Sequence, residues 1–305
     1  MGHNAEVIGF GALNCDKIYR VDDLALPGRE TGVITATKQP GGSAANTIVG
    51  LTRLGVRTGF IGTVGNDSEG SLLLDDLKRE GVDLHGIIKA EGHTGSALIF
   101  IDSRGERAIY ILPSVNDTFV IANLDYVKNA KILHISSFMG VDQLRMQISY
   151  VKQFQAKRTK ISFSPGNIYV KLGLNELKPL IKRSFVLFLN KEEANTLTGS
   201  SDVEDVSSLL DFGTEIVAVT LGNLGSYVVT HKESLYLPPF ESKISDTVGA
   251  GDAFAAGFLY GQLTDKDIQK SGLYGNFIAS KSIAELGGRK GLLRDLNGLS
   301  DLIYI

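Results

Sequence analysis

The chain has 305 residues, of which 43% are hydrophobic and 21% charged, and its formal net charge at pH 7 is −3. This composition is that of an ordinary globular protein, and the lack of a long basic run argues against a nucleic-acid partner bound by charge. With one cysteine, no apolar stretch near the roughly 20 residues of a membrane span and no signal-like N-terminus, we expect a cytoplasmic protein without a membrane partner.

Strand and helix patterns alternate along most of the chain. Strands are predicted at 7–13, 58–64, 131–136, 160–163, 185–189 and 215–220, followed by a hairpin of 226–230 with 235–237. Helices are predicted at 43–54, 67–80, 143–157, from 251 onward, and at 266–286. This alternation is typical of an α/β fold with a doubly wound, mostly parallel sheet and helices on both faces. We expect one domain spanning residues 1–305.

Two stretches, residues 15–38 and 94–113, do not follow the alternation. The first combines polar/apolar alternation with turn signals at 26–28, and the second has the pattern of a hairpin with its turn at 102–105. Extra hairpins at sheet edges are common decorations without a further role. We predict a small β sheet that stands off the main domain.

Polar residues and glycines follow the first strand and open the first helix. Asn14 and Asp16 point the same way if the strand continues, and an amide beside a carboxylate suits vicinal hydroxyls. The same residue types also favour a simple turn. Gly41 and Gly42 let a ligand approach the backbone, and Asn46 follows one helical turn later, although an ordinary helix start would look the same. These five residues are the candidate site for a polyhydroxyl ligand.

The segment 246–252, Asp-Thr-Val-Gly-Ala-Gly-Asp, precedes an apolar run at helical spacing. Gly249, Ala250 and Gly251 leave the backbone bare where that helix begins, so unpaired N–H groups and the positive end of the helix dipole can hold an anion, most naturally a phosphate. Asp252, in the first turn, is either a helix cap or a base that takes a proton from a hydroxyl attacking phosphorus. The chain contains no Walker loop that would hold the phosphate instead.

Four motifs, in order, resemble the signatures of the ribokinase-like, or PfkB, carbohydrate kinase family. They are GGSAANT at 41–47, NKEE at 190–193, VTLGNLG at 219–225 and DTVGAGDAFAAGF at 246–258. The resemblance extends over nearly the whole chain. It implies an ATP-dependent phosphotransferase that moves the γ-phosphate to a primary hydroxyl of a small sugar, with Asp252 as base. A nucleoside (adenosine-like) kinase of the same family is the alternative, and a catalytically silent regulator is a third reading, which an intact Asp252 disfavours.

The resemblance also implies roles for residues at two later strand ends. Asn190 and Glu193 match the pair that organises Mg²⁺ and phosphates, with Glu193 acting on the metal through water. A helix cap followed by a first-turn acid would give the same pattern. Thr220, Gly222 and Gly225 match the loop that runs along the nucleotide. These residues form the expected ATP and Mg²⁺ site.

Three further features are implied by the resemblance alone. Asn276 matches a position near the adenine. Asp246, with the loop around Gly287 and Gly288, matches a monovalent-cation site that K⁺ would occupy. The small sheet of 15–38 and 94–113 matches the family's lid over the substrate, and a homodimer through this lid is the assembly we consider.

The acceptor stays open because the chain departs from the family pattern. Ser164 stands where many relatives carry an aspartate, and Ser43-Ala44-Ala45 replaces the Lys-Gly-Ala of typical ribokinases, which puts ribose itself in doubt. A nucleoside kinase would need a surface for the base. Phe100, Tyr110 and Phe138 are the candidate aromatics for it, although aromatic residues more often belong to the core.

Overall fold

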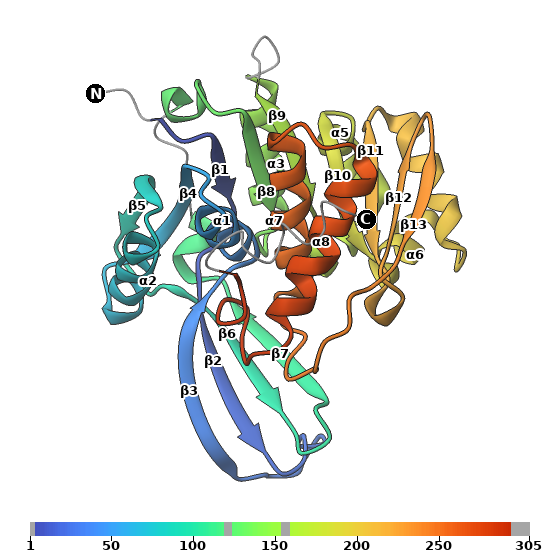
Figure 1. Cartoon of the computed structure of the whole chain (residues 1–305). Helices are drawn as coiled ribbons and strands as arrows, with labels where there is room; N and C mark the ends of the chain where they lie inside the picture. Colours follow the sequence, from blue (N-terminus) through green and yellow to red (C-terminus); the bar gives the residue numbers. More distant parts are fainter. Residues whose placement is uncertain (1–3, 119–123, 154–158, 294–305) are drawn as a thin grey trace.

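The larger of two sheets has nine strands, and the computed structural model describes residues 4–118, 124–153 and 159–293. Its strands are β1 (Val7–Phe10), β4 (Thr58–Gly65), β5 (Asp83–Ala90), β8 (Ile132–Ser136), β9 (Lys160–Ser164), β10 (Ser184–Asn190), β11 (Ile216–Thr220), β12 (Ser226–Thr230) and β13 (Ser234–Leu237). They lie in the order β13-β12-β11-β10-β9-β8-β1-β4-β5 (Figure 1). From β11 to β5 all neighbours run parallel, and β12 and β13 add an antiparallel hairpin. The predicted mostly parallel sheet is confirmed.

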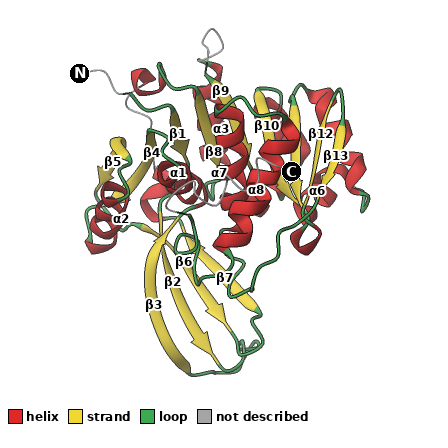
Figure 2. Cartoon of the chain, in the orientation of Figure 1, coloured by secondary structure: helices red, strands yellow, loops and turns green. Residues whose placement is uncertain are grey.

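Helices cover both faces of this sheet (Figure 2). One face carries α1 (Ser43–Arg53), α2 (Ser68–Arg79), α7 (Ala250–Leu263) and α8 (Ile268–Ser282), and the other carries α3 (Val141–Lys152), α4 (Gly166–Val170), α5 (Leu174–Ile181), α6 (Lys191–Thr198) and the 3₁₀ helix η3 (Val203–Phe212). The buried side chains therefore form two hydrophobic clusters, one on each face. Because both faces are covered, a central strand such as β4 is buried along its whole length. Within the described ranges, no helix has the length and hydropathy needed to span a bilayer.

Several element boundaries differ from the sequence prediction. β1 stops at Phe10, short of residue 13, because the chain turns there into the second sheet. α8 ends at Ser282, short of residue 286, and the chain continues into a loop in which Gly287 has a φ of 86°. The helix predicted at 143–157 is α3, and the last part of that prediction lies outside the described residues. Neither β5 nor η3 was predicted, since β5 is a half-buried edge strand without regular alternation.

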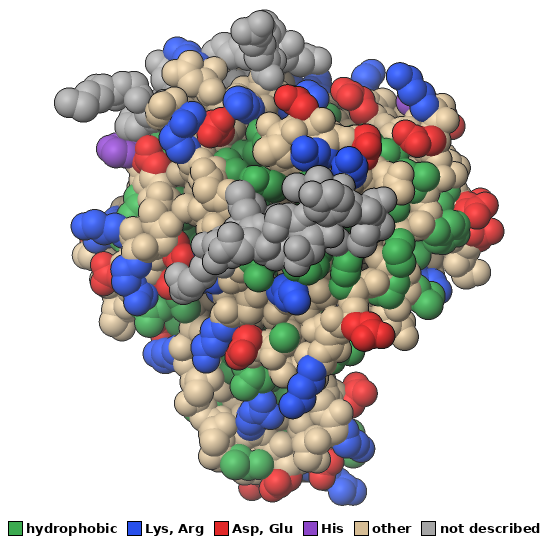
Figure 3. Space-filling model, viewed as in Figure 1, with side chains coloured by type: hydrophobic (Ala, Val, Ile, Leu, Met, Phe, Trp, Pro, Cys, Tyr) green, Lys and Arg blue, Asp and Glu red, His purple; other side chains and the backbone are tan. Residues whose placement is uncertain are grey.

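The smaller sheet has four strands and projects from one edge of the main body (Figure 1). Its strands are β2 (Asn14–Val21), β3 (Val33–Gly41), β6 (Gly95–Ile101) and β7 (Arg107–Leu112), in the order β3-β2-β6-β7. In the space-filling view it forms the narrow end of the molecule (Figure 3). The prediction of a small sheet built from the two irregular stretches is confirmed.

Candidate active site

The candidate residues gather where the small sheet joins the large one. β1 lies between β4 and β8, so the chain runs to one side of β1 first and returns on its other side. Such a switch point is where open α/β sheets bind ligands, at the carboxyl ends of the strands. α1 begins against the end of β8, because the hydroxyl of Ser136 accepts a hydrogen bond from the backbone N–H of Ala44 at 3.2 Å.

The start of α7 forms a cradle for an anion. Gly249 precedes the helix with a φ of 78°, and a Cβ there would lie 2.7 Å from the Cα of Gly288, so both the conformation and the space require glycine. The backbone N–H groups of Gly251 and Asp252 have no acceptor within the described part of the chain. A Cβ on Gly251 would meet nothing within 4 Å. Exposed helix-start donors with open space in front of them suit a phosphate.

Asp252 is tied to α1 rather than to its own helix. Within the described residues, the hydrogen bonds to its carboxylate come from α1. The hydroxyl of Ser43 donates to Oδ1 at 2.7 Å, and the amide of Asn46 donates to Oδ2 at 2.9 Å. Burial raises the pKa of Asp252 to about 6, against the opposing effect of these two hydrogen bonds and of the Arg289 charge. The group is thus held in one orientation beside the anion cradle, with a pKa in the range of a general base.

Asn14, Asp16 and Gly41 meet at the start of the small sheet. Asn14 is paired with Gly41 in the β2–β3 ladder, and the Asp16 carboxyl lies directly over Gly41, where it fills the space a Cβ would need. Burial raises the pKa of Asp16 to about 7; the Arg289 charge opposes this and the Asp252 charge adds to it. The side-chain oxygen of Asn14 accepts a hydrogen bond from the side-chain nitrogen of Asn116 at 2.9 Å. The side-chain NH₂ group of Asn14 is left to donate to a ligand.

Gly42, the remaining glycine of this group, is placed by its backbone. Its φ is 101°, and a Cβ there would collide with the carbonyl oxygen of Ala12. Only glycine therefore allows the chain to leave β3 and enter α1 at this point. The five residues predicted to bind a polyhydroxyl ligand thus lie at one junction, where β2 begins, β3 ends and α1 begins. Asp252 lies at the same junction, because Asn46 donates the hydrogen bond described above to it.

Asn190 and Glu193 form a capping box at the start of α6. The backbone N–H of Glu193 donates to the Asn190 side chain at 2.9 Å, and the N–H of Asn190 donates to the Glu193 carboxylate at 3.0 Å. Burial raises the pKa of Glu193 to about 7, and the charges of Glu192 and Asp252 add to that rise. The described residues contain no group of three or more His, Cys, Asp or Glu side chains arranged for a metal. The single carboxylate of Glu193 beside the Asn190 amide fits a Mg²⁺ that keeps most of its water and phosphate ligands.

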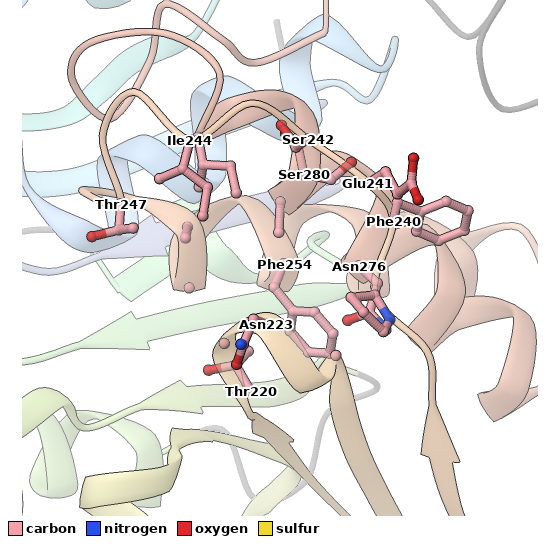
Figure 4. A pocket seen from close by; sticks show the side chains of 17 residues that line it. Thr220, Asn223, Phe240, Glu241, Ser242, Ile244, Thr247, Phe254, Asn276 and Ser280 are labelled. Carbon is pink, nitrogen blue, oxygen red and sulfur yellow. The ribbon is translucent and has the colours of Figure 1, made fainter.

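A pocket of about 430 Å³ adjoins the anion cradle. Figure 4 shows Ile244, Ser242 and Ser280 on one wall, Thr220 and Asn223 on the opposite wall, and Phe254 between them. Four of the six residues predicted to bind the nucleotide line it, namely Thr220, Gly222, Gly225 and Asn276, whereas Asn190 and Glu193 do not. The pocket also reaches Ala250 and Gly251, so a planar apolar group bound here would have its phosphates at the start of α7.

The structure assigns Asn276 a supporting contact. Its amide donates to the carbonyl oxygens of Leu237 at 3.2 Å and Pro238 at 2.8 Å. Both amide hydrogens are therefore used to hold the segment after β13 against α8. The donor side of Asn276 shapes the pocket wall, and only its carbonyl oxygen is left to meet a ligand.

Asp246 lies against the loop at Gly287. One Asp246 oxygen accepts the N–H of Val248 at 3.0 Å, and the other accepts the N–H of Gly287 at 3.0 Å. The guanidinium of Arg107 is 3.8 Å from the carboxylate and donates to the Thr247 hydroxyl at 2.7 Å. Asp246 thus connects the segment 246–252 with the loop after α8 and with the small sheet.

Sequence patterns did not identify several residues of this site. Arg107 and Arg289 carry no motif, Ser43 lies within a motif that assigns it no role, and Asn116 lies three positions after Pro113, outside the four motifs. The only signal for Arg289 is its place beside the predicted glycine pair. Their roles follow from contacts between segments far apart in the chain.

The three candidate aromatics do not share one surface. Phe138 is buried in the core, 5.9 Å from Phe10 between ring centroids. Phe100 and Tyr110 contact each other on the small sheet at 6.2 Å, with Tyr19 stacked on Phe100 at 5.0 Å. Phe138 therefore belongs to the core, and its ring also borders the small cavity beside Asn14.

Known proteins resemble this chain over most of its length. A family model described as pfkB family carbohydrate kinase matches residues 4–294. An uncharacterized sugar kinase of Archaeoglobus fulgidus is 40% identical, over 82% of this chain and 100% of that protein. An ATP-dependent ribose-1-phosphate kinase of Halopiger xanaduensis is 33% identical over 93% of each chain. The crystal structure of a nucleoside kinase of Methanocaldococcus jannaschii superposes with a TM-score of 0.84 at 26% identity, covering 99% of both chains.

Proposed function

The chain belongs to the pfkB family of carbohydrate kinases, and we propose that it transfers the γ-phosphoryl group of ATP to a primary hydroxyl of a small sugar. It is a carbohydrate or nucleoside kinase, an enzyme with an alcohol group as acceptor. The observation that carries the proposal is Asp252. Ser43 and Asn46 hold this carboxylate in place. It lies between the residues predicted to bind a polyhydroxyl ligand and the start of α7, where N–H groups are unpaired.

Each step of the transfer has a residue in the proposed mechanism. Asn14 and Asp16 bind hydroxyl groups of the sugar and turn its primary hydroxyl toward Asp252. Asp252 takes the proton of that hydroxyl as its oxygen attacks phosphorus. The backbone of residues 249–252, through the unpaired N–H groups of Gly251 and Asp252, holds the oxygens of the transferring phosphoryl group, where negative charge develops.

The nucleotide lies in the pocket next to α7 in this proposal. Thr220, Gly222 and Gly225 follow its length, and Asn276 holds the wall beside its base. Glu193 would hold Mg²⁺ through water, and the metal would supply positive charge that offsets the phosphate charge. Asp246 is our candidate ligand for a monovalent cation, which would lie beside the loop at Gly287.

We favour a small sugar over a nucleoside because the matching family is described as carbohydrate kinases, and because the cavity beyond Asn14 offers no ready place for a base. The cavity there measures about 20 Å³ and is bounded by Ile111, Phe138 and Met139, among others. A nucleobase needs far more room than one water-sized space. The nucleoside alternative keeps support from the nucleoside kinase that superposes on this chain, and it requires the small sheet to open further.

Acceptor preference tests the function directly. With ATP and Mg²⁺, we expect kcat/KM to be higher for a member of the set ribose, fructose and ribose 1-phosphate than for adenosine, inosine or cytidine. Release of ADP is measured with each acceptor. A nucleoside preferred by more than about 10²-fold, or ~2.7 kcal/mol of transition-state binding, would overturn the sugar assignment. Tight ATP binding without turnover of any acceptor would favour a silent regulator.

The small sheet acts as a lid in this proposal. Polar contacts to the body include those of Lys17 and Lys38 with Glu69 of α2, at 3.0 and 2.7 Å. On the other edge of the sheet, Arg107 donates to the Thr247 hydroxyl. Closure over the acceptor would exclude water from the phosphoryl donor. The lid also exposes apolar side chains near both of its edge strands, including Ile34 and Ile109, and a second copy of the chain is the partner we predict for them.

Acceptor binding is expected to slow hydrogen exchange in residues 15–38 and 94–113 together. A closed lid shields both hairpins, whereas a static sheet shields neither. Exchange measured by mass spectrometry, with and without a saturating true acceptor, checks this. The β12–β13 hairpin at 226–237 is the internal control, since it lies at the far edge of the large sheet. Unchanged exchange in both stretches would make them a fixed decoration.

A further inference from the structure

Arg289 lies on the loop after α8, and its guanidinium is buried at the junction where the candidate site is built. Its Nε donates to the carbonyl oxygen of the Asn46 side chain at 2.8 Å. Its Nη2 donates to the backbone oxygen of Gly41 at 3.2 Å, and its Nη1 pairs with the carboxylate of Asp76 on α2. One side chain therefore links the end of β3, α1 and α2 behind the proposed base.

The side-chain amide of Asn46 connects Arg289 to Asp252 through two hydrogen bonds. Its oxygen accepts from Arg289, and its nitrogen donates to Asp252 Oδ2 at 2.9 Å. Rotation of the amide by half a turn would place an oxygen against the carboxylate, which repels it. The bond from Arg289 selects the orientation in which Asn46 donates. Through the Gly41 carbonyl, the same guanidinium also fixes the backbone under Asp16.

The charge of Arg289 faces both acids of the junction. It opposes the burial that raises the pKa values of Asp16 and Asp252. Asp76 and Glu80 lie beside Arg289, and Arg53 donates to the Arg289 carbonyl at 2.6 Å. The other ionisable groups that interact with the two acids are the Cys15 thiol next to Asp16 and the Glu193 carboxyl, whose pKa the charge of Asp252 helps to raise. Among the residues that the structure describes, Arg289 is the one cation that opposes the rise at Asp16 and at Asp252.

We propose that Arg289 is a positioning residue. Through Asn46 it orients the Asp252 carboxylate, and through the carbonyl of Gly41 it holds the backbone on which the Asp16 carboxyl rests. This inference rests on the proposed function, because it assigns Arg289 a purpose only if Asp252 is the base. Arg289 itself touches neither the acceptor nor the nucleotide in this scheme. Its removal should change both kcat, through Asp252, and the acceptor KM, through Asp16.

The pH dependence separates this role from a structural one. Asp252 works only when deprotonated, so kcat falls as pH drops through its pKa of about 6. Loss of the neighbouring cation raises that pKa further, so the acid limb of the kcat profile moves to higher pH. For Arg289→Gln we expect kcat at pH 7 to fall about 10–10²-fold and part of the loss to be recovered near pH 9. Merely loosened packing would lower activity without moving the limb.

Two matched variants complete the experiment. Arg289→Lys keeps the charge but loses the forked geometry, so its acid limb should stay near that of the wild type while kcat is reduced. Arg79→Gln is the control: Arg79 meets Asp76 from an exposed position, at 3.3 Å, and touches nothing in the site. Its kcat, KM and pH limb should be unchanged.

Clear results would overturn the proposal. An Arg289→Gln enzyme with a wild-type acid limb and unchanged acceptor KM would reduce Arg289 to packing. If Arg289→Gln does not fold, Arg289→Lys decides, and full wild-type kcat there would show that the forked contact to Asn46 is unnecessary. Failure of the proposed function looks different, because a wild-type protein without turnover, or without an acid limb, would remove Asp252 rather than Arg289.

Discussion

Replacement of Asp252 by Asn is expected to lower kcat by at least ~10²-fold, since a general base typically contributes about 10²–10⁴ in rate. Asparagine keeps the shape of the side chain and loses the ability to take the hydroxyl proton. The hydrogen bond from Ser43 can persist on the amide oxygen, whereas the donor of Asn46 would face either an oxygen or a second NH₂ group. ATP affinity should change little, because the N–H groups at the start of α7 remain.

The control for this substitution lies at the other end of the same helix. Asp265 follows α7, is exposed and has a φ of 56°, a conformation that asparagine tolerates well. Asp265→Asn should therefore retain wild-type kcat and KM. Steady-state kinetics with saturating ATP and the preferred acceptor make the comparison. A loss of less than tenfold in Asp252→Asn would remove Asp252 from the role of base.

The fold could be predicted from the sequence because local patterns report it faithfully. Buried parallel strands read as apolar runs, and the helices after them begin at residues such as Asp67, which accepts the N–H of Gly70 at 2.7 Å. β5 escaped prediction because an edge strand with half-buried residues has no sharp alternation. The position of the small sheet followed from hairpin patterns, whereas its contacts with the body did not.

The candidate site divides in the same way. Asn190 and Thr220 were identified because they match motifs of the family, and they lie at strand ends, which parallel strands bring to one edge. The two arginines were missed because their partners are remote: Arg107 and Thr247 are 140 positions apart, and Arg289 and Asn46 are 243 apart. A basic side chain outside a motif gives no local sign of the acid or amide it will meet. Only the folded chain brings these groups together.

The identity of the acceptor depends on a different kind of information. Asn14 and Asp16 describe the chemistry of hydroxyl binding, but the size of the acceptor is set by side chains from separate segments. Ile111 comes from the lid and Phe138 from the loop after β8, and both bound the small cavity beyond Asn14. Volume at such a junction is a property of packing between elements, which sequence periodicity does not encode.

Replacement of Gly251 by Val is expected to lower kcat by at least ~10²-fold with the fold intact, because removal of a single well-aimed donor costs about 10²–10³ and a steric block should cost no less. Gly251 is exposed at the start of α7, and its Cβ would enter open space. Valine is no worse a helix former than glycine, so the helix itself should not be weakened. The branched side chain instead fills the space in which the phosphoryl oxygens would approach the backbone.

A graded series and one matched site make this test specific. Gly251→Ala adds a single methyl group and should lose less activity than Gly251→Val. Gly32, in the lid, is the control, because a Cβ there also meets nothing within 4 Å and its φ is not positive. Gly32→Val should leave kcat near the wild-type value, and thermal unfolding of all three variants checks the fold. If Gly251→Val folds and turns over normally, the phosphate does not bind at the start of α7, and the N–H groups there serve some other ligand.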